Sequence, residues 1–274
     1  MNKFYGFANL LIYTEQRGEL NVLDIMKLLQ RLVLIIGIVF SSILYGQGPP
    51  LRVAIEHFSP PFIMRASNNQ FYGFDISLIE NICKQLDRAC QYNVMRFEDL
   101  IFAVESNLAD VAISAIAITI PRARRVKFSL PYLISRSRFL GGKELSDAPF
   151  SLMLLNNKKI GVEAGSVFNN QIGQMGLQNT RVIPYDDVHS LIEALGNDDV
   201  DVVLLDNPSA VFWEHQSGGR FKTLGMPFDY GFGLAVAVNK ENETLLTQIN
   251  AALLNYQNSG EYQKNYRKYL EHLR

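Results

Sequence analysis

Arg122 and its neighbours offer the clearest chemistry in this sequence. The segment 114–132, SAIAITIPRARRVKFSLPY, follows an apolar run and places Arg122 directly after Pro121. Proline suits the first turn of a helix, where its missing N–H costs nothing. A guanidinium beside the free N–H groups of a helix start can bind a carboxylate. The alternative is a solvated basic face formed by Arg122, Arg124 and Arg125, and the segment by itself leaves both interpretations open.

Other functional chemistry is sparse. The four histidines show no metal-ligand spacing, and the chain has only two cysteines. No Walker or dinucleotide-binding glycine pattern occurs, because the segment GSVFNNQIG lacks the required lysine. The net charge is -1, and no Lys/Arg run carries interleaved aromatic residues. We therefore expect no metal, no cofactor, no catalytic residue and no nucleic-acid partner.

The N-terminal region has the pattern of a secretory signal peptide. An apolar run at 32–45 is too short for a comfortable membrane span. It follows Lys27 and Arg31 and precedes small residues, as a signal peptide does. We predict a signal peptide at 26–48 and an upstream extension at 1–25 that results from a misplaced start codon. An uncleaved anchor is the alternative.

The two cysteines, Cys83 and Cys90, are close in the sequence. In an exported protein such a pair predicts a disulfide. Seven residues of continuous helix would separate their Cα atoms by about 10.5 Å, beyond the limit of about 7 Å for a bridge. A disulfide therefore requires the helix to end before Cys90, and two free thiols are the alternative.

The rest of the chain alternates short apolar strands with amphipathic helices. The expected strands are 51–56, 91–95, 110–114, 158–162, 181–185 and 199–206. The expected helices are 75–86, 99–106, one opened by Ser166, 186–196, 208–215, 243–260 and 261–273. Asp75 and Ser166 are placed to cap the helices that they open.

This alternation predicts an α/β fold with a mainly parallel sheet. Extended crossings at 136–145 and 229–240 join two β–α series, which predicts two lobes with a ligand cleft between them. We assign 49–138 and 232–274 to the first lobe, and 139–231 to the second. With 274 residues, 48% of them hydrophobic, the chain is long enough for two cores.

From residue 51 onward the motifs resemble the family 3 bacterial extracellular solute-binding proteins, the amino-acid receptors of ABC importers. The matching pieces are LRVAIE…PPF, GFDISLIENI, FEDLI, ADVAISAIAIT, RxxxVxFSxPY, KKIGVEAGS and DVDVVLLD. The Cys83–Cys90 spacing also resembles the disulfide of the basic-amino-acid branch. The resemblance implies a two-lobed periplasmic-binding-protein fold of type II, whose two β-strand hinge crossings let the lobes close on an amino acid. It further implies a monomeric, non-catalytic protein of the periplasm, with an inner-membrane ABC permease and its ATPase as partners.

Two residues carry the central role that the resemblance implies. Arg122 matches the arginine that binds the ligand α-carboxylate, and Asp206 matches the acid that pairs with the α-ammonium. A zwitterion needs one fixed cation and one fixed anion, and their placement on opposite lobes makes binding favour closure. Asp206 also precedes the helix expected at 208–215, so a helix N-cap is its alternative role.

Other matched positions line the ligand pocket of the family. Ser114 and Thr119 match polar lining positions, and Ser166 matches a helix start whose N–H groups help to hold the carboxylate. Phe97 matches an aromatic residue that stacks on the ligand side chain. The alternatives are core packing for Phe97 and a structural hydroxyl for Thr119. Glu56 matches an acid that faces a side-chain cation, which favours arginine, lysine, ornithine or histidine, although relatives of other specificity also carry this acid.

Several positions depart from the family pattern. Ser59 stands where Tyr or Phe is usual, so either Phe58 takes over the stacking or the sandwich is one-sided. Ala117 stands where a polar side chain commonly contacts the ligand, so that contact is missing. Val167 replaces a second hydroxyl, and Phe168 follows where a polar residue is frequent.

Enzymes on the same fold are the alternative class. Cyclohexadienyl dehydratases share the carboxylate-binding arginine, and their catalytic glutamate lies three residues beyond Asp206, where this chain has Ser209. Dehydration needs a general acid or base, which a serine without a nearby base does not supply. Lytic transglycosylases and sensory receptors of this kind carry additional domains. We therefore expect a binding protein and not an enzyme.

Overall fold

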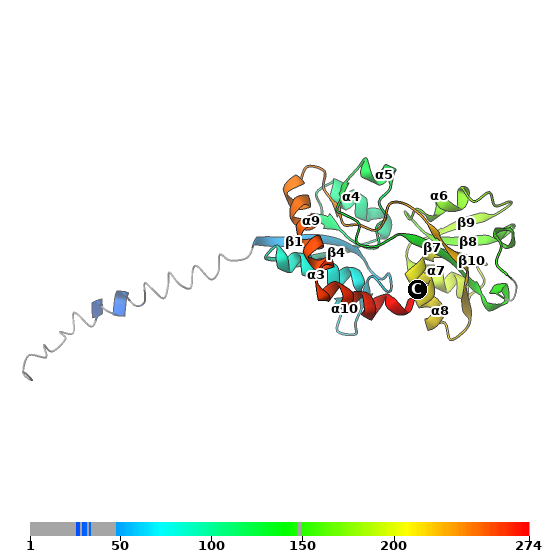
Figure 1. Cartoon of the computed structure of the whole chain (residues 1–274), viewed down its shortest axis with the longest axis horizontal. Helices are drawn as coiled ribbons and strands as arrows, with labels where there is room; N and C mark the ends of the chain where they lie inside the picture. The colour runs from blue at the N-terminus through cyan, green and yellow to red at the C-terminus, as the bar shows by residue number, and fades with distance from the viewer. Residues whose placement is uncertain (1–25, 28, 32, 34–47, 147–148, 274) are drawn as a thin grey trace, which may run out of the picture. The chain divides into compact units, whose positions relative to one another are not determined.

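The computed structural model describes residues 26–27, 29–31, 33, 48–146 and 149–273. Residues 1–25 and most of the expected signal peptide at 26–48 lie outside this range. The chain divides into two compact units, Met1–Gly48 and Pro49–Arg274, and the second unit carries the fold (Figure 1). Within the described residues, no helix combines the length and the apolar character needed to cross a membrane.

The first sheet has five strands in the order β4-β1-β5-β12-β6. They are β1 (Gly48–Glu56), β4 (Arg88–Met95), β5 (Val111–Ala112), β6 (Lys127–Phe128) and β12 (Ala237–Val238). β5 runs parallel to β1, whereas β12 runs antiparallel to both β5 and β6. The sheet is therefore mixed and not mainly parallel, because β12 runs against both of its neighbours.

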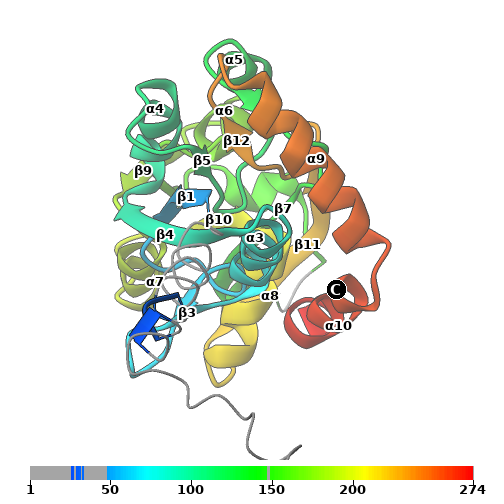
Figure 2. The same ribbon diagram turned by 90° about the vertical axis from the view of Figure 1, so that its left-hand side faces the viewer.

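Helices cover both faces of this sheet because its strands are apolar on both faces. Successive residues of a strand point to opposite faces. Val53, Val111 and Val238 accordingly join one core with α3 (Phe74–Gln85) and α9 (Glu243–Gln257), and α10 (Gly260–Tyr269) packs beside it (Figure 2). The small side chains of Ala54, Ala112 and Ala237 join the core under α4 (Leu100–Glu105).

The second sheet also has five strands, in the order β11-β7-β10-β8-β9. They are β7 (Arg136–Gly142), β8 (Lys159–Glu163), β9 (Arg181–Tyr185), β10 (Val202–Asp206) and β11 (Phe221–Asp229). β8, β9 and β10 are parallel, and β7 is antiparallel to its two neighbours. α7 (Val188–Gly196) and α8 (Asn207–Gln216) share a core on one face, and α6 (Phe168–Gly173) packs into a second core.

The remaining elements are short. They are the hairpin β2 (Met64–Arg65) and β3 (Phe71–Tyr72), the helix α5 (Ile120–Ala123), and the 3-10 turns η1 (Phe97–Asp99), η2 (Lys143–Ser146), η3 (Leu152–Leu155) and η4 (Glu271–Leu273).

We call the sheet that contains β1, with its helices, the first lobe, and the sheet that contains β7, with its helices, the second lobe. The chain passes from the first to the second between β6 and β7 and returns between β11 and β12. On the return, Leu234 bridges to Ala117 and Leu133. The segment at 136–145 does not itself cross, because β7 pairs inside the second sheet. The exact lobe boundaries at 138/139 and 231/232 stay a prediction.

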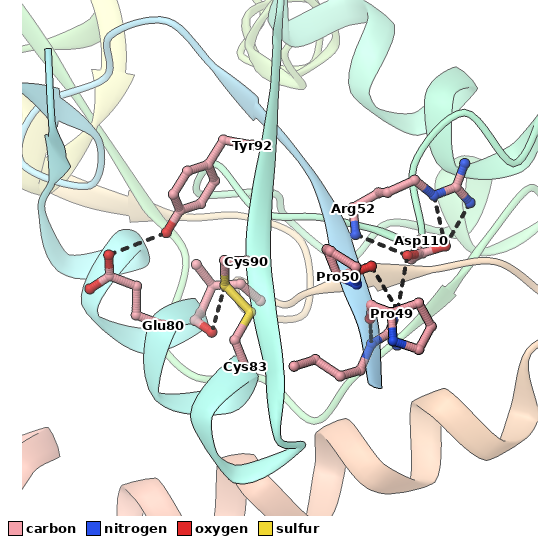
Figure 3. Close-up of a disulfide and its surroundings, with 10 residues drawn as sticks. Pro49, Pro50, Arg52, Glu80, Cys83, Cys90, Tyr92 and Asp110 are labelled. Carbon is pink, nitrogen blue, oxygen red and sulfur yellow. Dashed lines mark hydrogen bonds and ion pairs between the residues drawn. A yellow bond between two sulfur atoms is a disulfide. The ribbon is translucent and has the colours of Figure 1, made fainter. Parts of the chain in front are cut away.

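Cys83 and Cys90 form a disulfide with their Cα atoms 5.8 Å apart. α3 ends at Gln85 and the chain reverses into β4, which returns the second cysteine to the side of the first (Figure 3). The disulfide and the end of the helix before Cys90 are confirmed.

An ion-pair cluster fixes the beginning of β1 beside the disulfide (Figure 3). Asp110 accepts a hydrogen bond from Arg52 Nη2 at 2.6 Å and another from Arg88 Nη2 at 3.4 Å. The Arg88 guanidinium also donates to the carbonyl oxygens of Pro49 and Pro50. These contacts join the first residues of the compact unit to β4 and to the start of β5.

Two predicted helix caps are wrong. α3 begins at Phe74 with Gly73 as its N-cap, and the Asp75 carboxylate turns inward. It accepts hydrogen bonds from the Ala115 N–H at 2.7 Å and the Tyr132 hydroxyl at 3.0 Å. Asp75 therefore fixes the loop that follows β5, because a buried backbone N–H needs a partner.

The second error concerns α6. This helix begins at Phe168, with Val167 at the N-cap position, and Ser166 lies one residue too early to cap it. The Ser166 hydroxyl accepts a hydrogen bond from the Phe168 N–H at 3.4 Å and so shapes the turn before the helix.

Candidate functional site

Three acidic residues end three buried strands. Glu56 is the last residue of β1, Glu163 the last of β8, and Asp206 the last of β10. β8 and β10 are parallel neighbours, so their carboxyl ends meet at one edge of the second sheet. Ligands of α/β proteins bind outside the carboxyl ends of parallel strands. Glu163 was not among the predicted site residues, although its place at the end of an apolar strand is the same signal that marks the other two acids.

Arg122 is held toward this edge by its own helix and loop. Thr119 is the N-cap of α5, where its hydroxyl accepts a hydrogen bond from the Arg122 N–H at 3.4 Å. The guanidinium donates from Nη1 to the carbonyl oxygen of Ala117 at 3.0 Å and lies 5.3 Å from the centre of the Phe97 ring. Burial lowers the pKa of Arg122, which the negative charge of Asp206 opposes.

The other two arginines of the segment lie on the surface. Arg124 is exposed, and Arg125 forms an ion pair with Glu105 at 2.6 Å. Of the three arginines, Arg122 alone lines the cavity described below.

Asp206 stands at the N-cap position of α8, but its carboxylate makes no cap hydrogen bond. It accepts a hydrogen bond from the Tyr230 hydroxyl instead. Burial raises the pKa of Asp206 to about 7, although Tyr230 and Arg122 both favour its charged form. Tyr230 was not among the predicted site residues, because it lies on the return crossing and its partner Asp206 belongs to another element.

Glu56 and Glu163 face one another from different lobes. Each carboxyl group shifts the pKa of the other, and the two residues are 4% and 8% exposed. No N–H or O–H of the described residues meets the geometry of a hydrogen bond with either oxygen of Glu56. Burial raises the pKa of Glu56 to about 8, and nearby Ser59 and Ser114 moderate this rise. Burial and the Glu56 carboxyl raise the pKa of Glu163 well above its usual range.

Most of the predicted site residues surround one small cavity of about 20 Å³. Its lining includes Arg122, Asp206, Ser114, Phe97 and Ser166, together with Ser59, Ala117, Val167, Glu163 and Tyr230. An adjoining cleft of about 550 Å³ shares several of these residues.

Three predicted residues lie elsewhere or act differently. Thr119 caps α5 and lines the adjoining cleft, and Glu56 is outside the cavity lining but interacts with Glu163, which is in it. Phe58 is outside the lining and packs edge-on against Trp213 of α8, with ring centres 6.2 Å apart. Ser59 lines the cavity in its place.

The described part of the chain contains no group of three or more histidine, cysteine, aspartate or glutamate residues arranged to hold a metal ion. The polar groups at this edge are instead one guanidinium, three carboxyl groups, three serine hydroxyls and the Tyr230 hydroxyl. Such a set can bind an organic ligand that carries both a carboxylate and cationic groups.

Comparison with known proteins decides the family. Residues 51–272 match the model of the bacterial extracellular solute-binding proteins, family 3. The chain belongs to this family.

Similar proteins support the fold of this solute-binding protein. The ABC transporter arginine-binding protein 1 of Escherichia coli K12 is 28% identical over 84% of this chain and 96% of its own. The solved structure of an ancestral arginine-binding protein bound to arginine has a TM-score of 0.76 and 31% identity, over 82% of this chain and 100% of its own. The predicted α/β fold with two lobes is thereby confirmed.

A more distant structure shares the fold alone. It is an ancestral amino-acid-binding protein described as a precursor of cyclohexadienyl dehydratase, with a TM-score of 0.73 and 24% identity over 82% of this chain and 96% of its own.

The two lobes of this solute-binding protein touch around the cavity. Arg122 Nη2 donates to the carbonyl oxygen of Gly165 at 3.1 Å, and the Ser209 hydroxyl donates to the carbonyl oxygen of Pro60 at 2.7 Å. Gly165 has φ +74°, and a Cβ at this position would lie 2.5 Å from the Cβ of Glu98 on the first lobe. Glycine is therefore required there, both for the backbone angle and for the close approach of the lobes.

Proposed function

We propose that this protein binds a basic amino acid between its lobes and delivers it to the permease and ATPase of an ABC importer. The observation that carries the proposal is the placement of Arg122 and Asp206 on one cavity, from opposite lobes. Arg122 would bind the α-carboxylate and Asp206 the α-ammonium. The carboxylate and the ammonium of one ligand contact charges on opposite lobes only when the lobes are closed. A zwitterion therefore stabilises the closed arrangement more than the open one.

Ligand entry requires the lobes to separate. A cavity of about 20 Å³ holds roughly one water molecule, which is far less than an amino acid occupies. The contacts of Arg122 with Gly165 and of Ser209 with Pro60 both span the lobes and would break on opening. The guanidinium would then be free to exchange the Gly165 carbonyl for a ligand carboxylate, which is the stronger partner because it is charged.

Glu56 supports the choice of a basic ligand. Its carboxyl group is buried and meets no hydrogen-bond donor among the described residues. A buried acid without a partner favours a cationic ligand group, since an uncompensated buried charge is costly. The similar proteins that are named for arginine agree with this choice.

We expect Glu56→Gln to weaken arginine and lysine binding by about 2 kcal/mol or more. Binding of neutral amino acids should change little, because glutamine keeps the shape and removes the charge. Calorimetric titration with arginine and glutamine separates the two effects. An equal loss for both ligands would argue against contact of Glu56 with the side chain.

Membership of the family supports the remaining assignments, which are proposals. We infer that the protein acts as a monomer in the periplasm after removal of a signal peptide, and that it is not an enzyme. Ser209 supports the last point, because its hydroxyl donates to the Pro60 carbonyl and is 3% exposed. A serine in this setting joins the lobes and offers no general acid or base to a dehydration reaction.

A thermal-shift screen tests the proposed function. The purified protein is heated with each of the twenty amino acids, ornithine and citrulline at equal concentration. A ligand that binds the folded state raises the melting temperature by mass action, and we expect the largest rise with a basic amino acid. No shift with any amino acid, together with turnover of prephenate or arogenate, would instead establish the dehydratase alternative.

A further inference from the structure

The carboxyl groups of Glu56 and Glu163 are not needed to bind the α-carboxylate or the α-ammonium of the ligand. A carboxylate can only accept hydrogen bonds. Two buried carboxyl groups in hydrogen-bonding reach are therefore joined only when a proton lies between them. Glu56 and Glu163 are buried neighbours that such a proton would join. Both are more than nine-tenths buried, each carboxyl group shifts the pKa of the other, and neither Glu56 oxygen meets a donor among the described residues.

Acids outnumber cations among the charged groups that act on this pair. Asp206, at the end of β10, and Asp187, before α7, act on Glu163 with the same negative sign. Arg122 is the cation that acts on it, and this arginine already bonds to the carbonyl oxygens of Ala117 and Gly165. On the first lobe, the polar neighbours of Glu56 are the uncharged hydroxyls of Ser59 and Ser114. The pair is therefore suited to take up one further positive charge.

We propose that Glu163 is a second residue for recognition of the ligand side chain. With Glu56 it forms a clamp of two carboxylates, one from each lobe, that holds the cationic end of a basic amino acid. The ligand cation replaces the shared proton, which passes to the solvent as the lobes close. This inference rests on the proposed function and adds to it a second contact, a contribution to closure, and a dependence of affinity on pH.

The direction of the pH effect follows from the raised pKa values of the pair. Burial raises the pKa of Glu56 to about 8 and that of Glu163 well above its usual range, so we expect the ligand-free pair to keep its shared proton at pH 7. A bound guanidinium or ammonium favours the charged carboxylates and lowers both pKa values. Binding then releases protons, and affinity for a basic ligand falls as the pH is lowered from about 8.

Asp206 also titrates near neutral pH, and the test must separate its effect from that of the clamp. Arginine and citrulline share the α-carboxylate and the α-ammonium, and they differ in the charge of the side chain. Asp206 and Arg122 therefore affect both ligands alike, and the difference between the two ligands reports on Glu56 and Glu163.

The experiment is calorimetric titration of the protein with arginine and with citrulline at pH 7, in buffers of different ionisation enthalpy. We expect arginine to release about one proton more than citrulline per ligand bound. Glu163→Gln should weaken arginine binding about 30-fold or more, change citrulline binding less than about threefold, and abolish the difference in proton release. Glu193→Gln, an exposed acid on α7, is the matched control and should behave as the unmodified protein.

Two results would overturn the clamp while amino-acid binding stands. One is equal proton release for arginine and citrulline in the unmodified protein, which needs no variant and so does not depend on how Glu163→Gln folds. The other is an equal loss of affinity for both ligands in Glu163→Gln. Failure of the unmodified protein to bind any amino acid would overturn the proposed function, and this inference with it.

Discussion

Replacing Arg122 by alanine is expected to abolish measurable amino-acid binding. The guanidinium is the cation that lines the cavity, and no other arginine or lysine is in its lining. Without it, the ligand carboxylate would enter a site that contains three acids and no compensating charge. Removal of one partner from a buried, hydrogen-bonded charge pair costs about 2–5 kcal/mol.

Two further variants make this result specific. Arg124→Ala removes an exposed arginine two residues away and should leave the affinity unchanged. Arg122→Lys keeps the charge but loses the planar fork that binds both oxygens of a carboxylate, so we expect intermediate affinity. Calorimetry with arginine and with a neutral amino acid gives the values for all three. Near-native affinity of Arg122→Ala for either ligand would show that the carboxylate binds elsewhere.

Asp206→Asn should produce the second large loss of affinity, also of about 2–5 kcal/mol. Asparagine has nearly the same shape and can still accept the hydrogen bond from the Tyr230 hydroxyl, so the cavity wall should remain in place. The substitution removes the charge that would pair with the α-ammonium. Asp199→Asn, an exposed acid before β10, is the matched control and should leave the affinity unchanged.

The pH dependence of ligand affinity is a second test of the role of Asp206. Burial raises the pKa of Asp206 to about 7, so protons occupy this carboxyl as the pH falls below that value. Affinity for every amino acid should then decrease from pH 8 to pH 6, because the α-ammonium binds the charged form. In Asp206→Asn the dependence on pH should disappear for a neutral amino acid. A neutral ligand whose affinity is the same at both pH values in the unmodified protein would contradict the role of Asp206.

The places of Arg122 and Asp206 in their local elements were predictable because each has a local signal. Arg122 follows a proline at a helix start, and Asp206 ends an apolar strand. The structure agrees with both signals, since Pro121 opens α5 and β10 ends at Asp206. Strand and helix types were predictable for the same reason, because apolar periodicity is a property of neighbouring residues.

The parts that were missed depend on distant contacts. Asp75 has the sequence signal of a helix cap, but its carboxylate serves the Ala115 N–H forty residues away. Phe58 packs on Trp213, which no local pattern indicates. Tyr230 reaches Asp206 from the return crossing between the lobes. In each case the partner comes from another element, and only the folded chain brings the two together.

Glu163 is a different kind of omission. Its signal was present in the sequence, because it ends an apolar strand as Glu56 and Asp206 do. Its meaning depends on Glu56, which lies 107 positions earlier and on the other lobe. Glu163 by itself therefore gives no indication of a neighbouring carboxyl group, whereas the packed lobes bring the two acids together.

The central claim is that a zwitterion is held by one cation and one anion on opposite lobes, and ligands that lack one charge test it most directly. L-Arginine, agmatine, which has no carboxylate, and 5-guanidinopentanoic acid, which has no α-amine, are titrated into the purified protein by calorimetry. We expect one L-arginine to bind per chain, and both analogues to bind at least about 30-fold more weakly. Binding of either analogue as tightly as L-arginine would contradict the assignment of Arg122 and Asp206.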